Sequence, residues 1–204
     1  YIIQERDNYD KVFVHMNQEY ILLAGIIWKI LNKDIFMWRN HNIGNKLTDI
    51  AASFCKKVFC TSRFSYTAKY KNTELMPVGV DLENFKANPN INRIPNSILS
   101  LGRIAPSKNI DILVDALVEM KNTDIVASIY GDSLLQDNTY YSELKRKGEN
   151  HVDFYKGIPN TETIKVYSAY GIFVNLSSSG MYDKTIFEAI ACGCLILASN
   201  DNLR

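Results

Sequence analysis

The sequence is short of the features that mark several protein classes. It holds only 5 prolines and 10 glycines in 204 residues, with 47% hydrophobic and 22% charged residues. These fractions are close to the globular average, and they exclude a wholly disordered chain and a fibrous or collagen-like one. The formal net charge is only +1. The chain as a whole therefore has no electrostatic attraction to nucleic acid or to an acidic surface.

Long apolar runs are also missing. No stretch reaches the roughly 18 apolar residues that a membrane-spanning helix needs. The most apolar run covers residues 21–28 and is followed at once by Lys29. We expect a buried helix there, with a helix lying on a membrane as the alternative. The chain begins with Tyr1 and shows no signal peptide, which suggests a fragment.

Cysteine is scarce and does not follow a metal-binding pattern. The four cysteines are Cys55, Cys60, Cys192 and Cys194. They do not form the paired C-x2-C pattern of a zinc ribbon, and no histidine lies close in sequence to complete a site. Dispersed cysteines among apolar residues are typical of reduced thiols that pack as small hydrophobic groups. We therefore expect no metal site, no disulfide and a reducing, cytoplasmic location.

Short apolar runs alternate with helix-like stretches along the chain, which predicts parallel sheets covered by helices. In the first part we expect strands at 12–15, 35–38, 58–61 and 75–77, and helices at 20–31, 46–54 and 65–70. In the second part we expect strands at 97–101, 124–130, 152–155, 172–176 and 195–198, and helices at 109–120, 141–147, 161–170 and 183–191.

The alternation breaks between residues 81 and 96, where the segment DLENFKANPNINRIPN is polar and rich in asparagine. Such a composition is typical of a linker. We therefore predict a first domain over residues 1–85, a linker over 86–96 and a second domain over 97–204. The last strand has no following helix to cover it, which suggests that this end is cut as well.

One loop with anion-binding chemistry joins the strand at 97–101 to the next helix. Gly102 allows a close backbone approach to a ligand. Arg103 can hold a phosphate with a forked pair of donors, and Lys108 adds a point charge beside a helix N-terminus. The alternative is that these are two solvated cations in an ordinary loop.

A second such loop runs from Ser177 to Lys184 and leads into a helix that carries Glu188. Lys184 and Glu188 are four residues apart and share a helix face. They can bind a phosphate and sugar hydroxyls respectively, or they can form a simple surface pair. The sequence has no G-x-G-x-x-G and no Walker A motif, which counts against NAD binding and P-loop hydrolysis.

The order of these motifs resembles a known family. GR…K before a helix is followed by YGDS, VDFYKGIP and NLSSSGMYDKTIFEAIACGCLILAS. This order resembles the donor domain of retaining glycosyltransferases of family 4. The segment MPVGVDLENF resembles their interdomain connection, and VFVHMNQEYILLAGIIWKILNKDIFMWRNH resembles the second half of their acceptor domain. The resemblance implies an α/β fold of GT-B type, with two Rossmann-like parallel-sheet domains, both incomplete in this chain.

The resemblance also implies roles for matched positions. Arg103 and Lys108 would bind the donor diphosphate and stabilise the departing nucleotide. Glu188 would hold the ribose, and Gly157 and Ile158 would lie against the base. The loop around the sugar and diphosphate is formed by Gly180, Met181, Tyr182, Asp183 and Lys184.

Four positions match the acceptor side. His15 stands at a strand end where the family has a histidine that helps to hold the transferred sugar, and it joins Arg103 and Lys108 as a candidate catalytic residue. His41 follows the next strand and is a candidate for lining the acceptor side. For both histidines the alternative is a structural role. Asn17 and Glu19 are weaker candidates. His151, in the second domain, is expected to be structural or solvent-exposed.

One position departs from the family pattern. The first glutamate of the E-x7-E motif falls at residue 180, which is Gly180 here. That glutamate usually contacts the donor sugar. Asp183 and Lys184 are expected to replace its contacts, and a weakened or inactive site is the alternative.

The expected function is transfer of a sugar from a nucleotide diphosphate sugar to an acceptor hydroxyl, with retention and without a metal or other cofactor. The expected partners are the nucleotide-sugar donor and a carbohydrate or glycolipid acceptor, with no nucleic acid. Membrane contact would be peripheral, through the acceptor domain at the inner face of the membrane. The alternatives are a non-catalytic nucleotide-sugar-binding or partner subunit and an epimerase.

Overall fold

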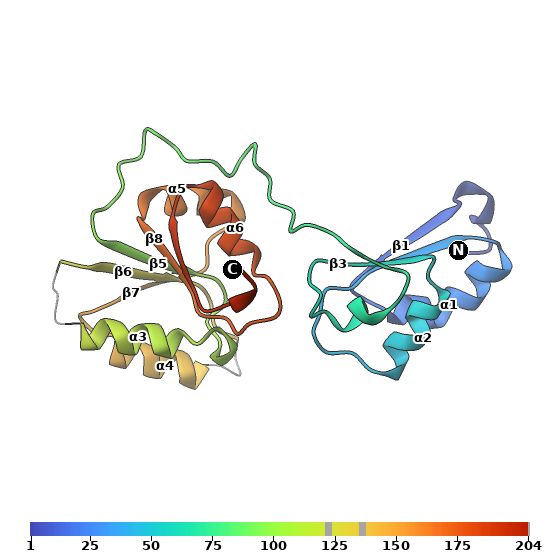
Figure 1. Cartoon of the computed structure of the whole chain (residues 1–204), viewed down its shortest axis with the longest axis horizontal. Helices are drawn as coiled ribbons and strands as arrows, with labels where there is room; N and C mark the ends of the chain where they lie inside the picture. Colours follow the sequence, from blue (N-terminus) through green and yellow to red (C-terminus); the bar gives the residue numbers. More distant parts are fainter. Residues whose placement is uncertain (121–123, 135–137, 204) are drawn as a thin grey trace. The chain divides into compact units, whose positions relative to one another are not determined.

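The structure is a computed structural model that describes residues 1–120, 124–134 and 138–203. The chain forms two compact units. One comprises Tyr1–Val78 with Gly180–Tyr182, and the other comprises Gly79–Ser179 with Asp183–Arg204. Each unit contains a sheet of its own (Figure 1). All the strand pairs in both sheets are parallel, as the alternation of strands and helices predicts.

The first unit has a four-stranded sheet in the order β1-β2-β3-β4. Its elements are the short 3-10 helix η1 (Arg6–Asn8), β1 (Lys11–His15), α1 (Glu19–Ile30), β2 (Asp34–Trp38), α2 (Lys46–Phe54), β3 (Lys57–Cys60), the 3-10 helix η2 (Tyr66–Lys69) and β4 (Thr73–Leu75). Alternate residues of β2 are buried, because one face of the sheet packs against α1 and α2. Gly25 of α1 lets the Phe54 ring of α2 come close, since an added Cβ would stand 3.0 Å from that ring.

The second unit has a five-stranded sheet in the order β7-β6-β5-β8-β9. Its elements are β5 (Ser97–Leu101), the 3-10 helix η3 (Pro106–Lys108), α3 (Ile110–Glu119), β6 (Val126–Tyr130), α4 (Asn138–Lys147), β7 (Asp153–Tyr155), α5 (Asn160–Ala169), β8 (Ile172–Asn175), α6 (Lys184–Ala191), β9 (Leu195–Ala198) and the 3-10 helix η5 (Asp201–Leu203). Helices α3 and α4 cover one face of this sheet, and α5 and α6 cover the other (Figure 1).

Two apolar cores lie on the two faces of the second sheet. Leu99 and Phe173 point toward α5 and α6 and are fully buried. Ile129 and Val174 point toward α3 and α4, where they meet Val114. Burial on both faces explains why the strands of this unit read as continuous apolar runs.

Most predicted elements are confirmed within a few residues, and two elements of the first unit differ from the prediction. The strand predicted at 75–77 lies at Thr73–Leu75 and pairs with β3. Pro77 has no N–H to donate to a sheet, so the strand cannot continue through residue 77. The helix predicted at 65–70 is the short 3-10 helix η2.

The boundary between the units differs from the predicted one. The sequence places the end of the first domain at residue 85, whereas the structure divides the chain between Val78 and Gly79. Phe85 is buried in the core of the second unit, against Tyr167. Arg93, within the predicted linker 86–96, donates hydrogen bonds to the backbone carbonyls of Tyr170 and Cys192. The polar segment after residue 79 is therefore attached to the second unit through Phe85 and Arg93.

The apolar run at 21–28 lies in α1, and the prediction of a buried helix holds for one face only. Ile21, Ala24 and Trp28 are buried against the sheet, whereas Leu23 and Ile26 are 82% and 61% exposed. Among the described residues, no helix combines the length and the apolar character that crossing a bilayer requires.

We predict that Arg93→Ala lowers the free energy of unfolding of the second unit by about 1–2 kcal/mol, because two charge-assisted hydrogen bonds to carbonyls are lost. Urea unfolding followed by circular dichroism measures the change. Arg146→Ala is the matched control, since Arg146 is exposed on α4, and its effect is expected to stay within about 0.5 kcal/mol. Equal stability of the two variants would contradict the prediction.

Candidate functional site

The strand order of the second sheet creates a crevice at its centre. From β5 the chain continues outward through β6 and β7, and it then returns to place β8 on the other side of β5. Where the strand order reverses in this way, the loops after the two central strands separate and leave a ligand-binding crevice. A cavity of about 200 Å³ lies there. Its polar lining residues include Arg103, Lys108, Asn175, Ser177, Asp183, Lys184 and Thr185.

A second cavity of about 340 Å³ adjoins the first. Both share Gly102 and Arg103, and the second is also lined by Asp132, Gly157 and Ile158. The structure therefore brings together the two predicted groups of donor residues at neighbouring cavities. Arg103 is exposed, and its guanidinium takes part in none of the ion pairs that the described residues form.

Close backbone packing fixes the loop between the two cavities. Gly102 adopts φ of +149°, and its N–H donates to the carbonyl of Tyr130 at 3.0 Å. Gly131 lies so close that an added Cβ would stand 1.9 Å from the Gly102 carbonyl oxygen. The Gly157 N–H donates to the Asp132 carboxylate at 3.1 Å. The sequence places Gly131 only at the end of a strand and carries no signal of this contact.

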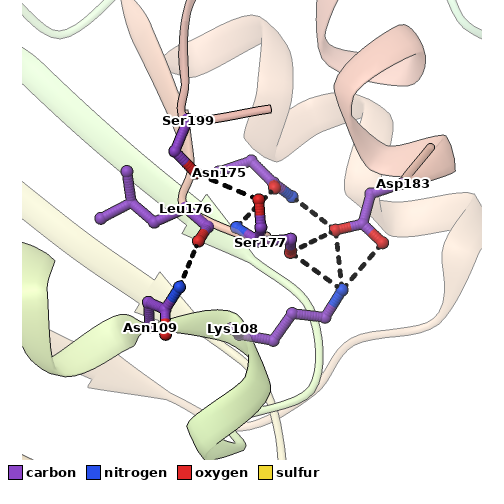
Figure 2. Close-up of polar contacts among 7 residues, drawn as sticks. All are labelled: Lys108, Asn109, Asn175, Leu176, Ser177, Asp183 and Ser199. Atoms are coloured by element: carbon purple, nitrogen blue, oxygen red, sulfur yellow. Dashed lines mark hydrogen bonds and ion pairs between the residues drawn. The ribbon is translucent and has the colours of Figure 1, made fainter. Parts of the chain in front are cut away.

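Lys108 is the centre of a polar network (Figure 2). Its ammonium donates to both carboxylate oxygens of Asp183, at 2.8 and 2.7 Å, and lies 3.2 Å from the Ser177 hydroxyl. Asp183 also accepts from Ser177 at 2.6 Å and from Asn175 at 2.9 Å. Asp183 immediately precedes α6 but does not cap it with its side chain. The network therefore joins the loop after β5 to the loop after β8.

The electrostatics of this network favour the ion pair. Burial alone would raise the pKa of Asp183, but hydrogen bonds from Lys108, Ser177 and Asn175 outweigh burial and hold the pKa below its ordinary value. The two side chains are about a quarter exposed. Asp183 is therefore ionised at neutral pH, and its oxygens are already occupied by these three neighbours. Its predicted role as a substitute contact for the donor sugar stays a prediction.

Glu188 is almost completely buried. Its side chain is 3% exposed and accepts from the Tyr167 hydroxyl at 3.3 Å and from the Asn160 amide at 3.5 Å. Lys184, one turn earlier on α6, forms an ion pair with it at 3.3 Å. The simple i,i+4 pair is therefore present, and the role of Glu188 in holding a ribose stays a prediction.

The residues of the predicted donor loop, 180–184, do not all belong to the same unit. Asp183 and Lys184 line the central cavity. Gly180, Met181 and Tyr182 group with the first unit. Their predicted contacts with the sugar and diphosphate stay predictions.

The predicted acceptor-side residues cluster at the carboxyl ends of β1 and β2 in the first unit. The exposed His15 ring stacks on Trp38, with ring centroids 6.4 Å apart. Asn17 and Glu19 follow it and are also exposed. His41 lines a hollow of about 270 Å³. The other residues of this hollow are Met16, Arg39, Ile43, Gly44 and Asn45, and the sequence pattern does not single out Arg39.

His151, predicted to be structural or solvent-exposed, lies in the turn between α4 and β7 and is exposed. All four cysteines are free and buried. Within residues 1–120, 124–134 and 138–203, no group of three or more His, Cys, Asp or Glu side chains is placed to hold a metal ion.

Comparison with known proteins identifies the family. The profile of the family described as glycosyl transferases group 1 matches residues 81–203. The chain belongs to this family. A curated relative, the GtfA subunit of a UDP-N-acetylglucosamine–peptide N-acetylglucosaminyltransferase from Streptococcus pneumoniae, is 31% identical over 107 residues. That match covers 50% of this chain and 20% of the relative.

Solved structures share the fold at low sequence identity. The chain is similar to HepE from Anabaena in complex with UDP, with a TM-score of 0.82 and 20% identity over 97% of this chain and 61% of HepE. It is also similar to sucrose-phosphate synthase from Thermosynechococcus elongatus, with a TM-score of 0.76 and 17% identity over 97% of this chain and 58% of that protein. These likenesses confirm the predicted GT-B fold class, and the chain spans about three fifths of each structure.

We predict that Asp183→Asn lowers the free energy of unfolding at pH 7 by about 1–3 kcal/mol, because Lys108 loses a charged partner in a partly buried site. The pKa of Asp183 is depressed in the folded chain, so its stabilising effect is complete above its ordinary pKa and is lost as the pH falls through the folded one. The difference between variant and wild type should therefore shrink below about pH 4.

Urea unfolding at a series of pH values measures this difference. Glu143→Gln, at an exposed position of α4, is the control for loss of one negative charge. A difference that is the same at pH 7 and pH 3 would show that the ion pair does not stabilise the fold.

We also predict that Gly131→Ala destabilises the second unit by about 1–3 kcal/mol, because its methyl group would collide with the Gly102 carbonyl and displace the loop. Gly79→Ala is the matched control, since a Cβ there meets nothing within 4 Å. Thermal unfolding of both variants measures the effect. A Gly131→Ala variant as stable as Gly79→Ala would mean that the loop adjusts without cost.

Proposed function

We propose that the protein containing this chain transfers a sugar from a nucleoside diphosphate sugar to an acceptor hydroxyl. Membership of the group 1 family supports this proposal. The observation that carries it is the cavity at the reversal of strand order, where Arg103 and Lys108 provide two cations next to the loops after β5 and β8. Two cations at such a crevice suit a diphosphate better than a neutral ligand.

The nucleotide is proposed to be UDP. The chain is similar to HepE, whose solved structure is a complex with UDP. It is also similar to GtfA, a subunit of an enzyme whose name gives UDP-N-acetylglucosamine as the donor. In this proposal the diphosphate lies against Arg103 and Lys108, and the base occupies the adjoining cavity beside Gly157 and Ile158. That cavity is the more apolar end, since Leu134 and Ile158 help to line it.

The chemical step is proposed to rest on electrostatic stabilisation of the leaving group. When the bond between the anomeric carbon and the phosphate oxygen breaks, negative charge develops on the diphosphate, and Arg103 and Lys108 stabilise it. The acceptor hydroxyl attacks from the same face, its proton passes to the departing phosphate, and configuration is retained. His15 would help to hold the transferred sugar. Because two protein cations meet the developing charge, no metal ion is required.

Lys108 has to serve two partners in this proposal. In the structure its ammonium is bound to Asp183 and lies near Ser177. A diphosphate would therefore share Lys108 with Asp183, while Arg103 remains available. We expect Arg103 to provide the larger part of the affinity for the free nucleotide.

A binding-only role is the second candidate function. Two observations favour it: Gly180 stands where the family has a glutamate, and Asp183 already occupies Lys108. A binding subunit would hold the nucleotide sugar without releasing the nucleotide in the presence of an acceptor.

The test is isothermal titration calorimetry of the chain with UDP and GDP. We expect UDP to bind, and Arg103→Ala to weaken binding by roughly tenfold or more, because a forked charge-assisted contact is lost. Binding should be unchanged in EDTA, since the proposed site uses no metal.

Arg146→Ala serves as the matched control, because it removes the same charge from an exposed helix of the same unit. Equal weakening by both variants would point to a general charge effect and contradict the site. Release of UDP from UDP-sugar by the full-length protein, only in the presence of an acceptor, distinguishes transfer from binding alone.

A further inference from the structure

The hollow at the carboxyl ends of β1 and β2 holds an arginine that the proposed donor site does not use. Arg39 directly follows β2 and is partly buried. Its Nε donates to the side-chain oxygen of Gln18 at 3.0 Å, and its Nη1 donates to the Ile43 carbonyl at 3.2 Å. Gln18 is itself buried, with 6% exposure. The guanidinium is therefore held in place from two sides.

Both of these partners are neutral. Lys33, Lys56, Lys57 and Lys69 of the same unit instead form ion pairs with carboxylates. Across the described residues, no carboxylate forms an ion pair with Arg39. A guanidinium has five N–H donors, and the two bonds above leave the remainder for a ligand. The positive charge in this hollow is therefore fixed but not neutralised.

His41 lines the same hollow. Its Nδ1 lies 2.9 Å from the Ile43 N–H nitrogen and 3.2 Å from the Ile43 carbonyl oxygen, so the tautomer decides whether Nδ1 accepts or donates. In the tautomer in which Nδ1 accepts from the Ile43 N–H, the proton is on Nε2, and His41 has an N–H group to offer to a ligand. A guanidinium and an N–H group both suit an oxyanion.

The charge of the whole unit has the same sign. Residues 1–78 contain 11 Lys and Arg against 7 Asp and Glu, a net charge of +4. The rest of the chain contains 12 against 15, a net charge of −3. A net positive charge on this unit raises the local concentration of anionic ligands.

From these observations we infer that the hollow lined by Met16, Arg39, His41, Ile43, Gly44 and Asn45 binds an anionic group of the acceptor, a carboxylate or a phosphate. This inference rests on the proposed function, because it assigns the hollow to the acceptor. The acceptor substrate is then an acidic glycan or a sugar phosphate rather than a neutral sugar. Arg39 is its specificity-determining residue, through a forked contact to two oxygens.

The experiment is a ¹H–¹⁵N NMR titration of the 204-residue chain at constant ionic strength. The probes are methyl glucuronide, glucose 6-phosphate and methyl glucoside, which carry a carboxylate, a phosphate and no charge. We expect at least one anionic probe to shift the Arg39 Nε–H and the Gly44 N–H signals, with an affinity tenfold or more above that of methyl glucoside. The tighter anionic probe identifies which oxyanion the acceptor carries.

Variants assign the effect to Arg39. Arg39→Gln should abolish the shifts at Gly44, and Arg39→Lys should weaken the binding severalfold, because it keeps the charge but loses the fork. Arg6→Gln is the matched control, since Arg6 is exposed before the start of β1, and it should bind as wild type does. If Arg39→Gln does not fold, the wild-type titration and Arg39→Lys still decide the matter.

The outcomes separate this inference from the proposed function. Equal binding of charged and neutral probes, or no shift at Arg39 with any anionic probe, overturns the inference. UDP is titrated separately and followed at Gly102 and Gly157 in the second unit. Absence of UDP binding there counts against glycosyl transfer, whatever the result at Arg39.

Discussion

The arrangement of the site depends on one constraint, the parallel pairing of β5 with β8. This pairing is short, with Ile98 opposite Ile172 and Leu99 opposite Phe173, and Leu99 and Phe173 are fully buried. Because β8 joins β5 on the side away from β6, the loops after these two strands begin next to each other and then diverge. Two residues 75 positions apart in the chain, Lys108 and Asp183, can meet only because of this pairing.

Strands and helices followed from the sequence wherever the local pattern decides the structure. The predicted bounds of α2, β5 and β9 are those of the structure, since each is a clear apolar run or an amphipathic stretch with polar ends. The sequence pattern gave the wrong prediction where a contact between residues far apart in the chain determines the structure. Polar residues surround Phe85, so its segment reads as linker, yet the Phe85 ring packs against Tyr167 in the second core.

The candidate site also has a part that local motifs predict and a part that depends on distant contacts. Local motifs were enough to predict that Arg103, Lys108 and Gly157 lie at the same edge of the sheet, because loops that follow parallel strands converge there. Motifs could not show that Asp183 turns toward Lys108 instead of outward, or that Glu188 is covered by Tyr167. They also could not single out Arg39. Its guanidinium is held by a hydrogen bond to Gln18, which lies in the loop between β1 and α1. Pairings between side chains of different loops leave no trace in residue spacing.

The buried cysteines have a practical consequence for labelling. Burial raises the pKa of Cys55 to about 12 and that of Cys192 to about 11, and it raises the pKa of Cys194 as well. Very little thiolate is then present at neutral pH, and thiolate is the form that reacts with maleimides. Cys60 is fully buried. A single cysteine introduced on the surface should therefore react selectively, and a fluorophore or spin label can be attached to the native background without replacing any of the four.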